Sequence, residues 1–285
     1  GRNSLQVAEF EERLLNARLA IQKYINQENS DYVKQYQDFS TGMHEQAKRL
    51  KSTVDSEHVK MVESIDQLIN KYDSSFAQTV ALTQQKNEII RDMAELGLDM
   101  QRTVESIIEN AAKENNAELL MSAGKVESQL LVSRYALLKY SQSRQRSDFD
   151  KTKEEITSKL EAVEDQMGEK AEKAGDSYRE LLEDFEKIHE SYLGMLPKLL
   201  ESIEQADDIT KNTLAQLGGA ISKTTQELRT QYRTAQDQLG PRVQQSSAAT
   251  IAVVTWLSIG AVLLGIALAW LLVRVIRRPI GGEPM

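Results

Sequence analysis

The chain of 285 residues contains no cysteine, which excludes disulfides, thiol nucleophiles and cysteine-ligated metal centres. Proline occurs only four times, and only Pro197 lies before residue 240. Because proline breaks helix interiors, its scarcity permits long uninterrupted helices. Aromatic residues make up 6% of the chain, which argues against a β-sandwich or β-barrel. These absences together predict an all-α fold.

Basic residues are outnumbered by acidic ones, 35 to 43, so the formal net charge is −8. Nucleic acid is therefore excluded as a partner, since phosphate binding requires a basic face. The sequence has no glycine-rich phosphate loop and no nucleophile motif, so we expect neither an enzyme nor a bound cofactor. The three histidines, His44, His58 and His189, lack metal-ligand spacing, and we expect them at surface or boundary positions without a metal.

One long apolar run lies near the C-terminus. Residues 248–273 carry no charge and exceed the ~20 residues that a bilayer-spanning helix needs. Both tryptophans, Trp256 and Trp270, lie in this run, and three arginines follow within residues 274–278. Because basic residues favour the cytoplasmic side, we expect a transmembrane helix at 248–273 in a bacterial inner membrane. Residues 1–247 would then be extracytoplasmic, with an earlier membrane helix upstream of the chain.

Apolar residues before this run recur with 3,4 spacing, which is typical of helices packed in bundles. Polar turn signals divide the pattern into six helices, and these signals lie near residues 26–30, 52–56, 113–116, 143–147 and 168–176. The third and sixth helices are long and the others short. Pro197 is expected to kink the sixth helix.

An internal repeat relates the two halves of this pattern. Matching positions are separated by 116 residues, as in Leu14 and Leu130, Arg18 and Arg134, and Tyr24 and Tyr140. The order short, short, long therefore occurs twice. Such lengths require two stacked four-helix bundles that share the two long helices. We expect the inner bundle to use approximately residues 1–80 and 203–247, and the outer bundle approximately residues 81–202.

The motifs LLNARLAIQKY (14–24), LLVSRYALLKY (130–140) and FEKIHESY (185–192) carry a family resemblance. In this order they resemble the helical bimodular (HBM) ligand-binding domain of bacterial methyl-accepting chemotaxis receptors, over residues from about 5 to 248. VIRRPI (275–280) resembles the first residues of a HAMP linker, so residues 274–285 are expected to begin that linker.

The resemblance implies a transmembrane chemoreceptor. Such a receptor binds a small metabolite outside the cell membrane and forms a homodimer. It signals through helix displacement to the HAMP linker, and cytoplasmic partners of the C-terminal part read that signal in chemotaxis.

Arg18 and Arg134 are the strongest binding candidates. Each directly follows a core position of its heptad and should point to the edge of a bundle interior. A partly buried guanidinium needs an anion or several acceptors, and it can hold a carboxylate through two hydrogen bonds. In the resembled family the corresponding arginines contact carboxylate ligands, with one site in each bundle.

Further candidates come from helix heights and from the resemblance. Counting residues along the helices places the following near Arg18: Tyr72, Phe76, Thr210, Lys211 and Asn212. Tyr192 should lie near Arg134, and it aligns with a family tyrosine of the outer site.

Several alternatives stay open. Leu15 stands where dicarboxylate-binding relatives have a second arginine, which argues against a doubly charged ligand in the inner site. An organic acid is favoured, although the acidic surface leaves an amine open. Arg18 and Arg134 could instead pair with internal carboxylates and fix the register of the bundles. The chain could also be the sensor domain of a transmembrane histidine kinase, or a structural or protein-docking module without a small ligand, and a binding protein could deliver the signal.

Overall fold

The computed structural model describes the backbone of residues 2–276 and the side chains of residues 5–234, 253–266, 268 and 270. The structure is 96% helical, and no strand occurs within the described residues. The predicted all-α fold is therefore confirmed.

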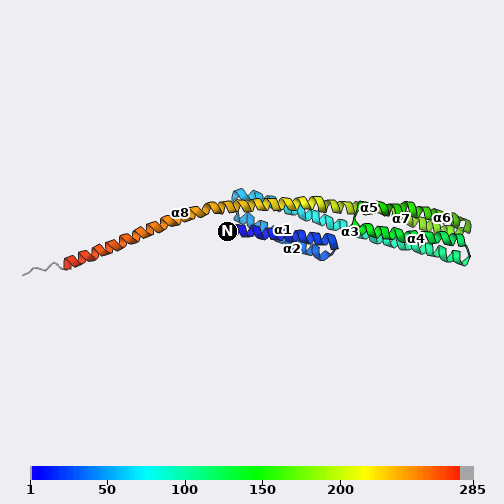
Figure 1. Ribbon diagram of the computed structural model, residues 1–285, viewed down its shortest axis with the longest axis horizontal. Coiled ribbons are helices and arrows are strands. Elements are labelled where there is room, and N and C mark those ends of the chain that lie inside the picture. The colour runs from blue at the N-terminus through cyan, green and yellow to red at the C-terminus, as the bar shows by residue number, and fades with distance from the viewer. Residues whose placement is uncertain (1, 277–285) are drawn as a thin grey trace, which may run out of the picture.

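The helices follow the expected order of two short and one long, repeated once (Figure 1). The first set is α1 (Arg2–Gln27), α2 (Ser30–Thr53) and the long α3 (Ser56–Lys113). The second set begins with α4 (Ala117–Ser143) and a continuous run of α5 (Arg146–Glu154), η1 (Glu155–Lys159) and α6 (Leu160–Ala174). It ends with a long continuous run of α7 (Asp176–Asp208), η2 (Ile209–Leu214) and α8 (Ala215–Ile276).

Side-chain caps explain where several helices begin. The carboxylate of Asp55 accepts hydrogen bonds from the backbone N–H groups of Glu57 and His58 at 3.1 Å each and so caps α3. Asn29 caps α2 by accepting a hydrogen bond from the backbone N–H of Asp31 at 2.9 Å. Asn116 caps α4 in the same way.

The loop predicted at residues 168–176 is wrong. Helix α6 continues to Ala174, because Met167 and Ala171 are fully buried and hold this segment in the bundle. Only Gly175 separates α6 from α7. Its φ of 132° lies in a region that residues with a Cβ rarely adopt, so a single glycine suffices for the reversal.

Two separate hydrophobic cores define two stacked four-helix bundles that share the long helices. The inner core is built from α1, α2, the first part of α3 and the η2–α8 segment, with members from Val7 to Val80 and from Ile209 to Tyr232. The outer core is built from the rest of α3, the α4 helix, the α5–α6 run and α7, with members from Ile89 to Ile203. Figure 1 shows the bundles end to end along the long helices.

Two π-helical segments, η1 and η2, interrupt the α-helical hydrogen bonding. A π segment widens a helix by one residue and often marks a functional position. Pro197, where a kink was expected, lies inside α7, which is continuous across it. The change of helical geometry comes instead at η2, where the long helix passes from the outer to the inner bundle.

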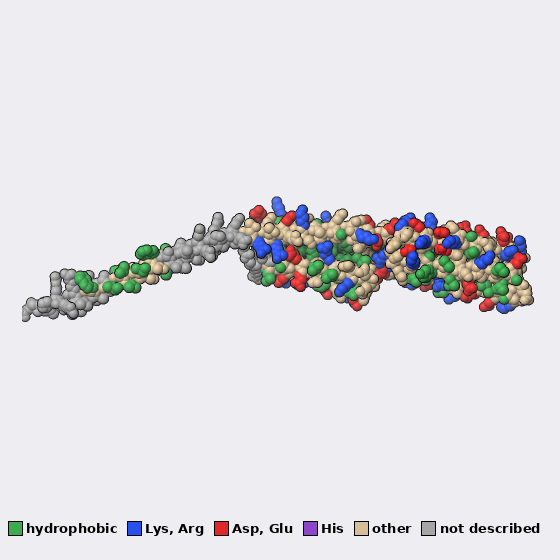
Figure 2. Space-filling view, in the orientation of Figure 1, with side chains coloured by type: hydrophobic (Ala, Val, Ile, Leu, Met, Phe, Trp, Pro, Cys, Tyr) green, Lys and Arg blue, Asp and Glu red, His purple; other side chains and the backbone are tan. Residues whose placement is uncertain are grey.

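Helix α8 runs on through residues 248–273, the segment predicted to cross a membrane. Its described side chains between Val253 and Ile266 are largely apolar and exposed (Figure 2). Across the residues that the structure describes, no helix is sufficiently long and apolar to span a bilayer. Of the predicted segment, residues 248–252, 267, 269 and 271–273 lie outside the described side chains. Of the predicted HAMP linker, residues 277–285 lie outside the described residues.

Candidate functional site

A groove of about 720 Å³ lies between α1 and α8 on the inner bundle. Its lining is mostly polar and basic, and the members are Glu11, Leu14, Leu15, Arg18, Ser222, Gln226, Arg229, Thr230, Arg233 and Thr234. The α1 residues come from the helix face beside the buried Leu14 and Ala17. Residues 222, 226, 229, 230, 233 and 234 recur at three- and four-residue intervals, so they form one face of α8.

Arg18, the first predicted binding residue, lies on this groove. Its side chain is exposed and packs over Gly218 of α8, where an added Cβ would be 3.5 Å from the Arg18 Nε atom. Among the described residues, no carboxylate lies within 4.0 Å of the Arg18 guanidinium. The prediction that an internal carboxylate pairs with this arginine therefore has no support in the described part of the chain.

Tyr72 is brought next to Arg18, as the sequence predicted. Its side chain is 2% exposed, and its Cε2 atom borders the same Gly218 position at 3.5 Å. Burial raises the pKa of the Tyr72 phenol to about 12, and the charge of Arg18 acts in the opposite direction. The phenol therefore stays neutral at physiological pH, so it can form hydrogen bonds to a ligand but carries no charge.

Arg229 and Arg233 are groove residues that the sequence reasoning missed. Arg229 donates to the Oε2 atom of Glu11 at 2.8 Å, whereas the buried Oε1 atom of Glu11 has no hydrogen-bond partner among the described residues. The groove lining thus holds three guanidinium groups and one carboxylate, and only Arg229 is paired with that carboxylate. The arrangement favours an anionic ligand, because a carboxylate can take up the remaining donors.

The outer bundle repeats part of this geometry around Arg134. Its Nη1 atom donates to the Oε1 atom of Gln101 at 3.0 Å, and its stem packs over Gly97, where an added Cβ would be 3.5 Å from Cδ. Tyr192 lies close enough for the Arg134 charge to counteract the rise in its pKa that burial causes. Its hydroxyl is buried and makes no hydrogen bond to the described residues.

The two arginines therefore occupy equivalent places. Arg18 lies on Gly218 beside Tyr72, and Arg134 lies on Gly97 beside Tyr192. A larger side chain at either glycine would take the space of the arginine stem. A glycine in an unbroken helix interior is the signal that would have identified Gly97 and Gly218 from the sequence.

The remaining predicted residues lie elsewhere. Phe76 is in the inner core, with its ring centroid 4.4 Å from that of Tyr36. Thr210, Lys211 and Asn212 are in η2, two turns from the α8 residues that face Arg18. Lys211 and Asn212 bond to carboxylates of their own helix.

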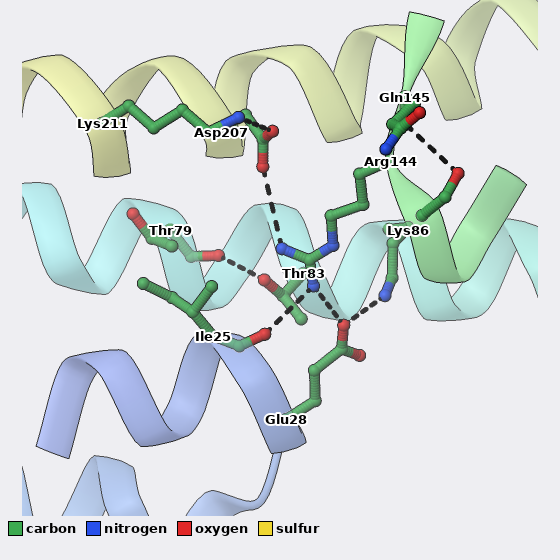
Figure 3. A network of polar contacts seen from close by, with 10 residues as sticks. Ile25, Glu28, Thr79, Thr83, Lys86, Arg144, Gln145, Asp207 and Lys211 are labelled. Carbon is green, nitrogen blue, oxygen red and sulfur yellow. Dashed lines mark hydrogen bonds and ion pairs between the residues drawn. The ribbon is translucent and has the colours of Figure 1, made fainter. Parts of the chain in front are cut away.

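The junction between the bundles carries a separate polar network (Figure 3). Glu28 lies in the turn between α1 and α2, and Arg144 lies in the turn between α4 and α5. Both residues adopt the left-handed conformation, with φ of 53° and 56°. The Arg144 Nη2 atom donates to the Glu28 Oε1 atom at 2.6 Å and to the Ile25 carbonyl at 3.3 Å, while Nη1 lies 3.7 Å from Asp207. Lys86 of α3 also pairs with Glu28.

Burial would raise the pKa of Glu28, but the hydrogen bonds from Lys86 and Asn87 and the nearby charges lower it below its usual value. The turn of the α1–α2 hairpin and the turn of the α4–α5 hairpin therefore contact each other through Glu28 and Arg144. They also contact the long helices through Lys86 and Asp207.

The expectation that all three histidines lie at surface or boundary positions is wrong for two of them. His58 and His189 are 8% and 4% exposed, and their Nδ1 atoms lie 2.6 and 2.5 Å from carboxylates of Asp55 and Glu164. In the described part of the chain, no three potential ligands gather into a metal site.

No known family model matches the sequence. No curated protein matches it either. Among solved structures, the fold is similar to that of the TorS sensor domain, whose crystal structure was determined in complex with TorT in the presence of TMAO. The similarity has a TM-score of 0.52 at 11% sequence identity, and it covers 80% of this chain and 98% of that one. At this identity it shows that the two chains share a fold.

Proposed function

We propose that the chain is the extracytoplasmic sensor part of a bacterial transmembrane receptor, and that its α1–α8 groove binds a small organic anion. The observation that carries the proposal is the groove itself. Its lining contains three guanidinium groups, those of Arg18, Arg229 and Arg233, and one carboxylate, that of Glu11, which pairs with Arg229. The fold shared with a sensor domain supports the same function. The proposal assigns no enzymatic activity and no cofactor to the chain.

The receptor could signal either to a chemotaxis system or to a histidine kinase. The sequence resembles a chemoreceptor domain, but the similar solved structure is that of a sensor domain, which favours the alternative of a sensor histidine kinase. Either output would be read by cytoplasmic partners, and both are compatible with a homodimer.

Signalling in this proposal passes through α8. This helix lines the groove and continues toward the segment predicted to lie in the membrane. An anion held between Arg18 of α1 and the arginines of α8 favours one packing of the two helices over another. Helix shifts of ~1–2 Å are typical of such transitions. Because α8 is continuous, such a shift can be transmitted along it toward the predicted linker.

A thermal-shift screen of the purified chain in detergent, against organic acids, amino acids and amines, tests the proposal. A ligand at 100 times its dissociation constant adds about 2.7 kcal/mol of stability. We expect an organic acid to raise the melting temperature, and Arg18→Ala or Arg233→Ala to weaken binding roughly tenfold or more, because hydrogen bonds to charged groups contribute about 1.5–3 kcal/mol.

Arg13→Ala is the matched control, because Arg13 is an exposed arginine of the same helix that lies against Gly42 of α2 rather than in the groove. It should leave the ligand shift unchanged. If only amines shift the chain, or if an acid shifts the Arg18→Ala variant as strongly as the natural chain, the anion site is wrong. If no compound shifts it, delivery of the signal by a second protein becomes the better interpretation.

A further inference from the structure

A second groove, of about 450 Å³, lies between α2 and α3 on the inner bundle. It shares no lining residue with the α1–α8 groove, so the two are separate. Its volume falls within the roughly 300–1,000 Å³ that small-molecule sites occupy. Such sites combine apolar walls with a few polar groups that orient the ligand, and this groove offers both.

The polar groups of the groove are gathered around Asp73 of α3. Tyr36, Ser40 and His44 follow at four-residue intervals and form one stripe of α2. The hydroxyls of Tyr36 and Ser40 donate to the Oδ1 atom of Asp73 at 2.5 and 2.6 Å. The Nε2 atom of His44 lies 2.9 Å from the Oδ2 atom.

The Asp73 carboxylate still has room for a donor. A carboxylate can accept about four hydrogen bonds, and only three are in place among the described residues. The position that is left belongs to Oδ2, whose one described partner is His44. Because the Asp73 side chain lines the groove and is 31% exposed, a ligand in the groove can reach it.

This cluster carries a net negative charge. The Nδ1 atom of His44 lies 2.8 Å from Asp66, so both ring nitrogens face carboxylate oxygens. A neutral imidazole has one N–H, so the imidazolium form fits this position. Among the described residues, neither Asp66 nor Asp73 has another cation within 4.0 Å. One cation against two carboxylates leaves a single negative charge, which one ammonium group would balance.

Away from this cluster the groove is apolar. Helices α2 and α3 form an antiparallel hairpin, so Val33 near the start of α2 faces Ala77 and Val80 of α3. Phe76 lies beneath them, with its ring centroid 4.4 Å from that of Tyr36. A hydrocarbon group that extends from Asp73 along the groove would therefore be removed from water on this wall.

The outer bundle fills the equivalent position differently. Asp73 precedes His189 by 116 residues, the spacing of the internal repeat. His189 and its partner Glu164 are only 4% and 7% exposed, so the outer core encloses that pair. The inner pair of His44 and Asp73 is instead about one-third exposed on a groove. Enclosure of an ion pair in a core therefore does not explain the inner cluster.

We propose that the α2–α3 groove binds a small organic monoamine. Its ammonium group contacts Asp73, and its hydrocarbon part lies against Val33, Ala77 and Val80. A metal ion fits this groove less well, because no three potential ligands gather among the described residues. The site differs from the α1–α8 groove in position and in the sign of its charge, so it does not depend on an anion being bound there.

Isothermal titration of the complete chain in detergent tests the proposal, with phenethylamine and butylamine as probes. Phenethyl alcohol has nearly the same shape without the charge and should bind more weakly than phenethylamine. Asp73→Asn should weaken amine binding roughly tenfold or more, because hydrogen bonds to charged groups are the strong ones. Glu88→Gln is the matched control, since Glu88 is an exposed carboxylate of the same helix outside the groove, and it should leave the affinity unchanged.

A second variant leaves the polar cluster intact, because Asp73→Asn also alters the hydrogen bonds of its neighbours. Ala77→Phe places a ring in the groove and should prevent amine binding. Ala94→Phe changes an exposed alanine of the same helix in the outer bundle and should have no effect.

Three results would overturn the proposal. They are no binding of either amine, equal affinity for phenethyl alcohol, and full amine affinity in either Asp73→Asn or Ala77→Phe. Arg18→Ala separates this site from the α1–α8 groove, because it should leave amine binding unchanged. Loss of amine binding in Arg18→Ala alone would place the amine in the α1–α8 groove and would also refute the α2–α3 site.

Discussion

His189 lies inside the outer bundle with oxygen acceptors at both ring nitrogens. Its Nδ1 atom is 2.5 Å from the Oε2 atom of Glu164, and its Nε2 atom is 3.0 Å from the carbonyl oxygen of Ile156. A neutral imidazole carries one N–H and can donate to only one of them. The site therefore fits the imidazolium form, buried as an ion pair with Glu164.

This geometry predicts a pH-dependent stability. Burial alone would lower the pKa of His189, but the hydrogen bond and charge of Glu164, with the Ile156 carbonyl, raise it above its usual value. A raised folded-state pKa contributes stability that is fully present below the unfolded value of about 6.5. That stability is lost as pH rises through the folded pKa, by about 1.4 kcal/mol for each unit of difference.

Chemical denaturation between pH 6 and pH 9 measures this effect. The natural chain should lose stability as pH rises, and His189→Gln should remove part of that slope. His44 supplies a remainder, because Asp73 and Asp66 overcome its burial and raise its pKa as well. His44→Gln is thus the matched comparison at a half-buried histidine, and it should remove that remainder of the slope. A His189→Gln variant with the full natural slope would contradict the buried imidazolium.

The sequence predicted the core positions around these residues but not the ion pair. Spacing identifies Leu130, Phe149 or Tyr178 as core, because burial of large apolar residues follows directly from helical periodicity. His189 and Glu164 lie on different helices, and only the folded bundle shows that each is the partner of the other. Without a visible partner, a charged residue is expected at the surface.

The hairpin tips at the bundle junction carry the second prediction. Glu28 pairs with Arg144 and Lys86, whose side chains are 19% and 7% exposed. Without Glu28, Lys86 would lose its carboxylate partner and Arg144 would keep Asp207 at 3.7 Å. Removing one partner of a buried ion pair costs about 3–5 kcal/mol, because the other charge stays buried. Glu28→Gln should therefore lower the free energy of unfolding by roughly 3 kcal/mol, as measured by urea denaturation.

Lys86→Met is the informative comparison at this junction. It removes a cation that burial disfavours, as the lowered pKa of Lys86 indicates, while Glu28 keeps Arg144 and Asn87. An apolar side chain of similar length should therefore cost much less than Glu28→Gln. Equal losses for the two variants would mean that Lys86, and not the contact between the hairpin tips, is the main stabilising group.

At the level of elements, the turns were predictable except for the loop expected at residues 168–176, and the helix irregularities were not. Asp55 is a cap that acts on its own neighbours, so the sequence carries the signal locally. The π segment η1 depends on other helices, since Gln129 and Ser133 of α4 donate to the Glu155 carbonyl and His189 of α7 bonds to that of Ile156. Local patterns do not contain those partners.

For the molecule as a whole, the predicted stacking of two bundles follows from helix lengths and the repeat. The binding candidates were predicted in part, because Arg18 and Tyr72 are neighbours in the structure while Thr210, Lys211 and Asn212 are not near them. Counting heights along a helix assumes a uniform rise. The repeat, by contrast, is a property of the chain and holds whatever the local geometry.

Because each bundle has its own core, damage to one should spare the other. Ile107 of the outer core and Ile69 of the inner core are both fully buried, so either change to alanine should cost about 2–5 kcal/mol. We expect Ile107→Ala to increase amide exchange throughout the outer bundle while inner-bundle amides and the Arg18 groove stay protected. Ile69→Ala should do the reverse. Exchange rising equally in both bundles for either variant would show that the shared long helices make them one cooperative unit, and a signal could then not be confined to one bundle.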